Sequence, residues 1–106
     1  MDRPTFLRLA DDAIRRVEDW LEDFDPDEVD FGTSDGVVTI EFPDGTKYVL
    51  NRQTAADQMW FAAGARAWHY DRDEQGRWLC DKDGHELFGR ISEVVSEKLG
   101  RPVKID

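Results

Sequence analysis

The fold of this chain is decided by the stretch VVTIEFPDGTKYVL, residues 37–50. From Val38 to Phe42 every second residue is large and apolar, which is the pattern of a β-strand with one buried face. Pro43-Asp44-Gly45 then signals a turn, and the apolar pattern continues through Tyr48–Leu50. This stretch therefore predicts two antiparallel strands joined by a tight turn.

Further short strands are expected on both sides of this hairpin. Ser34-Asp35-Gly36 marks a preceding turn, and Glu74-Gln75-Gly76 marks a later one. Between such signals, the sequence predicts strands at Val29–Thr33, Gln58–Ala62, Ala67–Asp71 and Arg77–Cys80.

An amphipathic helix is predicted at each end of the chain. From Pro4 to Phe24 apolar residues recur at spacings of three and four, and Pro26 closes the pattern. For the second helix, Asp83 is a candidate N-cap, with Glu86 three residues later as in a capping box, and Gly100 ends it. Its apolar face would be formed by Leu87, Phe88, Ile91, Val94, Val95 and Leu99.

The order of elements predicts an α+β fold, a two-layer sandwich in one domain spanning residues 1–106. Each helix has a single apolar face, so both can cover the same side of one antiparallel sheet and leave its other face open to water. A chain of this length buries roughly two-thirds of its unfolded surface. There is no apolar leader or membrane span, and the single cysteine suits a reducing compartment, so we expect a cytoplasmic protein.

The negative charge of the chain is concentrated in one stretch. No lysine or arginine occurs between Val17 and Thr46, whereas that stretch holds eleven carboxylates. The remaining residues hold 13 acids and 14 bases, so the net charge of −10 belongs to one part of the surface. A focused negative field selects cations or basic partners and makes nucleic-acid binding improbable.

These charges are placed where they oppose folding. Glu18 and Glu22 are four residues apart, as are Asp19 and Asp23, so like charges are neighbours on the first helix. Each such pair costs about 0.2–0.5 kcal/mol. Each carboxylate near the negative end of the helix dipole costs about 0.3–1 kcal/mol more. This cost favours a cation-binding or partner-binding site; the alternative is a solvated acidic face that maintains solubility.

The ligand types indicate which cation would bind. Carboxylate oxygens suit hard ions such as calcium, magnesium, manganese and iron. Zinc sites use thiolate and imidazole at close spacing, and the candidates Cys80, His69 and His85 are scattered along the chain. An EF-hand starting at Asp25 would need a bidentate glutamate where Gly36 stands. The pattern therefore predicts a shallow, multi-site acidic surface without a preformed cage.

The strand Gln58–Ala62 contains a candidate recognition residue. Alternation places Met59 and Phe61 on one face and Trp60 on the other. If the first pair faces the helices, Trp60 lies on the open sheet face, where tryptophan is a typical anchor for a protein partner. The alternative, that Trp60 simply packs across strands, stays open. Residues expected to be structural rather than functional are Cys80, Trp20, Trp68 and Trp78.

Several of these motifs resemble the frataxin family, and within it the bacterial CyaY-type members. The most specific is Asn51-Arg52-Gln53 followed by Trp60, and the resemblance extends over about residues 5–100. Trp68-His69-Tyr70-Asp71 matches the family's aromatic-His-aromatic-Asp strand, and Trp78 its late tryptophan. One departure is Arg66-Ala67, which stands where the family often has paired glycines.

The resemblance implies a protein of iron–sulfur cluster assembly that binds Fe²⁺ or Fe³⁺ weakly and docks on the cysteine desulfurase and the cluster scaffold. It implies an acidic ridge formed by Glu18, Asp19, Glu22, Asp23, Asp25, Asp27, Glu28 and Asp30. It also places partner recognition on the sheet face, at Asn51, Gln53 and Trp60. We expect a monomer that can assemble with iron.

Enzymatic activity is not expected from the sequence. No nucleophile–base pair, phosphate-binding loop or facial histidine–carboxylate site is evident. Two alternatives to the iron-binding accessory protein remain. One is a ferroxidase-like protein that oxidises or stores iron, and the other is an acidic module that binds basic proteins without metal.

Overall fold

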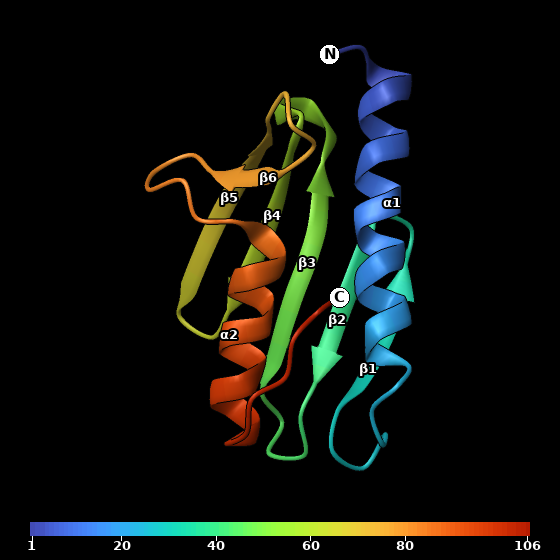
Figure 1. The fold of residues 1–106 in the computed structure, drawn as a ribbon. Coiled ribbons are helices and arrows are strands. Elements are labelled where there is room, and N and C mark those ends of the chain that lie inside the picture. Colours follow the sequence, from blue (N-terminus) through green and yellow to red (C-terminus); the bar gives the residue numbers. More distant parts are fainter.

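Two helices cover one face of a single antiparallel sheet in the computed structural model, which describes all residues from Met1 to Asp106 (Figure 1). The elements in order are α1 (Arg3–Leu21), β1 (Asp30–Ser34), β2 (Val37–Glu41), β3 (Lys47–Gln53), the 3₁₀ turn η1 (Thr54–Ala56), β4 (Gln58–Ala63), β5 (Arg66–Arg72), β6 (Trp78–Cys80) and α2 (Leu87–Leu99). The predicted two-layer α+β sandwich is confirmed, and every predicted strand is present. No helix is both long and apolar enough to traverse a lipid bilayer.

The six strands lie in the sheet in the same order as in the sequence, each antiparallel to its neighbours. In the central hairpin Glu41 pairs with Lys47. Between them Gly45 has φ +89°, a conformation that glycine adopts without steric cost. The Asp44 carboxylate accepts a hydrogen bond from the Thr46 amide at 2.9 Å and closes the turn. The turn residues thus fix the register from which the sheet extends.

Helix α1 begins earlier and ends earlier than its sequence pattern predicts. The Asp2 carboxylate caps it by accepting the Thr5 amide at 3.0 Å. The helix ends at Leu21 and not at Phe24. The amides beyond Glu22 donate to carbonyls three residues earlier instead of four, as in the bond from the Phe24 amide to the Leu21 carbonyl at 3.2 Å, and these tighter turns end the α-helix. Asp23 therefore lies beyond the helix.

The prediction that Asp83 caps α2 is wrong. The N-cap is Glu86, whose carboxylate accepts the amides of Phe88 and Gly89, each at 3.0 Å. The physical reason is a β-bridge between Leu79 and Glu86, which keeps the chain extended beside β6 until the helix starts at Leu87. Gly100 ends the helix with φ +70°, as predicted.

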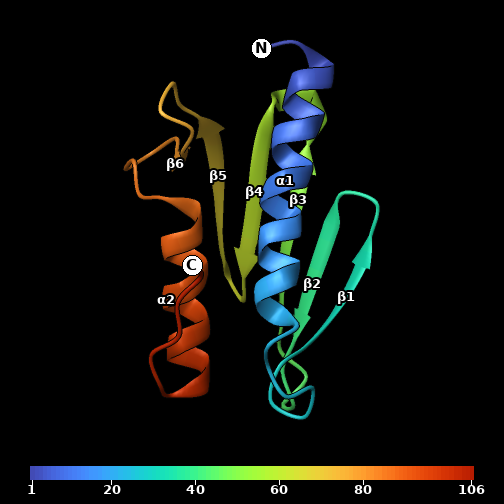
Figure 2. The same cartoon turned by 45° about the vertical axis from the view of Figure 1, so that its right-hand side comes forward.

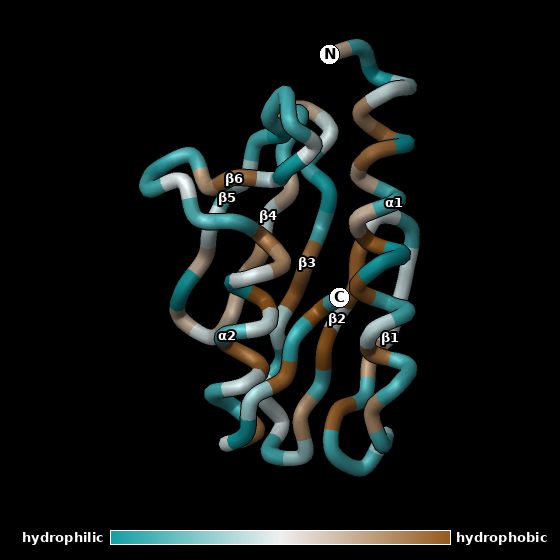
Figure 3. Tube along the Cα trace, viewed as in Figure 1, coloured by the Kyte–Doolittle hydropathy of each residue, from teal (hydrophilic) through white to brown (hydrophobic).

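The core lies between the sheet and the helices, where Figure 3 shows apolar residues on the inner sides of the elements. Trp78 and Cys80 are buried as predicted, whereas Trp20 and Trp68 are only partly buried. The C-terminal segment runs between the two helices (Figure 1) and buries Ile105, whose amide donates to Ser92 Oγ at 3.0 Å.

Candidate metal- and partner-binding site

The acidic ridge follows the end of α1, the loop after it and the first residue of β1. Glu18 and Asp19 lie in the last turn of α1, and Glu22 is its C-cap. The loop carries the next members, and Asp30 opens β1. In Figure 2 this segment lies at the lower end of the molecule, where the chain runs from α1 into β1. The local fold therefore brings all eight predicted metal-site residues into one strip at one edge of the sheet.

Most ridge carboxylates have no positive partner. The only ion pair joins Glu28 to Arg101, with Oε2 at 3.4 Å from Nε, and no other ridge carboxylate lies within 4.0 Å of a basic nitrogen. Asp25 and Asp30 accept main-chain amides, from Asp27 and Phe31, each at 2.9 Å. The remaining five side chains make no hydrogen bond within the chain: Glu18, Asp19, Glu22, Asp23 and Asp27.

The other three acids between Val17 and Thr46, a stretch without lysine or arginine, each form an ion pair with a base from another part of the chain. These pairs are Asp35 with Arg52, Glu41 with Lys47, and Asp44 with Lys98. The Lys98 ammonium and the Thr46 amide hold the pKa of Asp44 well below its ordinary value. Folding thus pairs the acids around the ridge and leaves the ridge itself as the uncompensated negative surface.

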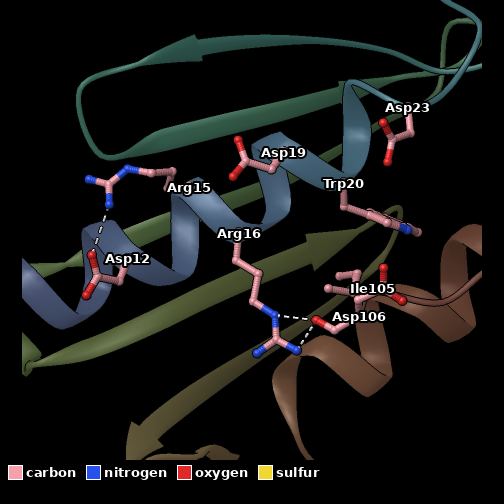
Figure 4. A pocket seen from close by; sticks show the side chains of 8 residues that line it. All are labelled: Asp12, Arg15, Arg16, Asp19, Trp20, Asp23, Ile105 and Asp106. Atoms are coloured by element: carbon pink, nitrogen blue, oxygen red, sulfur yellow. Dashed lines mark hydrogen bonds and ion pairs between the residues drawn. The ribbon is translucent and has the colours of Figure 1, made fainter.

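A groove of about 390 Å³ runs beside the ridge between α1 and the C-terminal segment (Figure 4). Asp19, Trp20 and Asp23 line it. Two bases of the groove are already engaged: Arg16 donates to the main-chain oxygen of Asp106, and Arg15 pairs with Asp12 at 3.1 Å. Arg15 and Arg16 therefore do not form ion pairs with the ridge.

The ridge has no preformed metal cage. Nowhere along it do three carboxylates place oxygens within 4.8 Å of one another. On this surface a hard cation would be held by one or two carboxylates and by water. Such a surface attracts cations through its negative field.

Trp60 lies on the open sheet face, in a row that crosses three strands. The register pairs Asn51 with Trp60 and Trp60 with His69. The Trp60 ring is stacked on His69, with centroids 4.2 Å apart and planes 14° apart, and Nε1 donates to Gln58 Oε1 at 2.9 Å. Trp60 therefore faces away from the helices and packs across strands, and its role as an anchor for a partner stays a prediction.

The other predicted recognition residues share this face. Asn51 and Gln53 alternate along β3 with residues that point toward the helices, and Gln53 pairs with Gln58. Alternation in β5 places His69 on the open sheet face, on the other side of the strand from the buried Tyr70. The open face thus presents a half-buried aromatic pair surrounded by amides.

Known proteins share the sequence features of this chain. Residues 1–101 match the family model of the frataxin-like domain. The chain is 39% identical over 100 residues to the iron-sulfur cluster assembly protein CyaY of Azotobacter vinelandii, a match that covers 93% of this chain and 90% of that protein.

Solved structures of frataxins have the same fold as this chain. Frataxin from Psychromonas ingrahamii superposes with a TM-score of 0.90 at 28% identity, covering 100% of this chain and 99% of that one. Trimeric frataxin from Saccharomyces cerevisiae, complexed with ferrous iron, gives a TM-score of 0.76 at 30% identity, covering 88% and 87%. On its fold, its sequence and the family match, the chain belongs to the frataxin family.

Proposed function

We propose that this protein is an iron-binding accessory protein of iron–sulfur cluster assembly and that it is not an enzyme. The proposal rests mainly on the unpaired ridge carboxylates, because the other three acids between Val17 and Thr46 each have a basic partner. Two named relatives support it: a cluster assembly protein and a frataxin complexed with ferrous iron.

Iron is the cargo of the ridge in this proposal. Its carboxylate oxygens suit Fe²⁺ and Fe³⁺, and the ligands do not converge on one point. Binding is therefore weak and spread over several positions, with water completing the coordination. Weak binding favours transfer, because the ion leaves when a partner offers better ligands.

The ridge and the open sheet face together form the docking surface. The ridge attracts a basic surface on the cysteine desulfurase, and Asn51, Gln53 and Trp60 contact the desulfurase or the cluster scaffold. Tryptophan beside amide groups is typical of protein interfaces. Because iron and a basic partner use the same carboxylates, iron and high salt should each weaken docking.

Measurements of iron uptake and of desulfurase binding test this proposal. The change of Glu22→Gln with Asp23→Asn should weaken both iron uptake and desulfurase binding. The control of Glu74→Gln with Glu97→Gln removes the same charge from exposed positions outside the ridge and should leave both intact. Equal behaviour of the two double variants would refute the proposal.

Iron titration separates the alternatives. If Fe²⁺ leaves the ridge amide signals in NMR spectra unmoved while desulfurase still binds, the protein is a metal-independent acidic module. If iron oxidation continues catalytically after the ridge is saturated, it is a ferroxidase. We expect ridge signals to move and any oxidation to stop at a stoichiometric amount.

A further inference from the structure

Three metal-ligating side chains meet at the opposite edge of the sheet from the ridge, where β6 leads into α2. Cys80, Asp83 and His85 each offer one ligand atom, and these atoms lie within 4.8 Å of one another. The prediction that Cys80 and His85 lie scattered is wrong. The structure corrects this, because the loop between them folds back on itself.

The loop is held by its own main chain. The Cys80 amide donates to the His85 carbonyl at 2.8 Å, and the Gly84 amide donates to the Cys80 carbonyl at 3.0 Å. Gly84 turns the chain with φ +76°, and the Asp83 carboxylate accepts the His85 amide at 3.1 Å. The three ligands are therefore placed by hydrogen bonds that are independent of any ion.

The His85 ring is fixed from both sides. Its Nδ1 lies 2.5 Å from Asp83 Oδ1, and its Nε2 lies 2.6 Å from the Tyr70 hydroxyl. Burial raises the pKa of Tyr70, so the hydroxyl stays protonated. A hydroxyl can donate to Nε2 or accept from it, so Tyr70 can stabilise either neutral tautomer of the ring.

We propose that Cys80 Sγ, Asp83 and His85 Nδ1 bind one divalent transition-metal ion of the zinc and cobalt class, with water as the fourth ligand. One sulfur, one nitrogen and one oxygen suit borderline ions and not the hard ions expected at the ridge. Metal–ligand bonds of about 2.0–2.3 Å place such ligand atoms about 3.5 Å apart. His85 Nδ1 and Asp83 Oδ1, now 2.5 Å apart, must therefore separate by about 1 Å, and no ligand atom has to move far because all three already lie within 4.8 Å of one another.

Metal binding at this site changes the position of two protons, one on Cys80 and one on His85. Binding removes the thiol proton of Cys80, because the thiolate is the ligand. The His85 proton moves from Nδ1 to Nε2, where the Tyr70 oxygen accepts it, as orienting groups beside metal-bound histidines do. This second site does not depend on iron binding at the ridge.

Cobalt titration of the full chain tests the proposal. Cys80 is the only cysteine, so any thiolate-to-cobalt absorption reports on this site alone. We expect that absorption to saturate at one Co²⁺ per chain, to disappear when Zn²⁺ is added and to persist in excess Mg²⁺. The Glu22→Gln, Asp23→Asn ridge variant should give the same absorption as the wild type.

Ligand variants complete the test. His85→Gln and Asp83→Asn should each weaken cobalt binding by about tenfold or more, and Tyr70→Phe should weaken it by about tenfold. Circular dichroism checks that each variant folds, and Asp83 is exposed in the loop, so Asp83→Asn disturbs no core packing. Absence of the absorption in the wild type would overturn the proposal. So would an absorption that neither His85→Gln nor Asp83→Asn changes.

Discussion

Neutralising the acidic end of α1 should stabilise the protein. Glu18 and Asp19 lie in the last turn of α1, and Glu22 is its C-cap. The last turn contains no basic residue, and none of these three carboxylates forms an ion pair. Each such charge at a helix C-terminus costs about 0.3–1 kcal/mol at low ionic strength. The combined change of Glu18→Gln, Asp19→Asn and Glu22→Gln should therefore raise the free energy of unfolding by about 1–3 kcal/mol.

Thermal unfolding at two salt concentrations measures this effect. For a domain of about 100 residues, a gain of about 1 kcal/mol raises the Tm by about 4 °C or more. In 1 M salt, where the Debye length is about 3 Å, most of the gain should vanish. The control Glu28→Gln loses the pair with Arg101 and should give no gain. An unchanged Tm, or a gain that salt does not reduce, would refute the idea that ridge charge opposes folding.

Three further outcomes are expected. Leu50→Ala empties a fully buried position and should lower the free energy of unfolding in urea by about 2–5 kcal/mol, whereas a loss below about 1 kcal/mol would contradict the core packing described. The bond from Lys98 and the Thr46 amide lowers the pKa of Asp44, so its stabilisation is present above its ordinary value of 3.8 and is lost as the pH falls below it. Asp44→Asn should therefore lower the Tm at pH 7, and its difference from the wild type should shrink below pH 3.8; a constant difference would count against the pairing. Trp60→Ala should weaken desulfurase binding while leaving iron-induced NMR shifts of the ridge unchanged, and intact binding would remove Trp60 from the docking surface.

The architecture could be predicted because it rests on local patterns. Period-two alternation around Val38–Phe42 and the turn at Pro43-Asp44-Gly45 identify the central hairpin, and the apolar stripes identify both helices. The ridge could be located because its members are nearly contiguous in sequence. Contiguous residues stay together whatever the rest of the chain does.

Features that depend on strand pairing or on the shape of an irregular loop could not be predicted in the same way. The start of α2 is set by the bridge between Leu79 and Glu86, and the stack of Trp60 on His69 requires the register of β4 and β5. The approach of Cys80 and His85 depends on main-chain bonds within an irregular loop. The spacing Cys80-x-x-Asp83-x-His85 is a usable signal once a tight loop is known.

The consecutive order of the six strands has a consequence for folding kinetics. Every ladder joins strands that are neighbours along the chain, so each pairing closes only a short segment and loses little chain entropy. The sheet can therefore assemble one hairpin at a time. The two helices, which come from opposite ends of the sequence, gain most of their burial only against an assembled sheet, so packing them should be the cooperative and rate-limiting event.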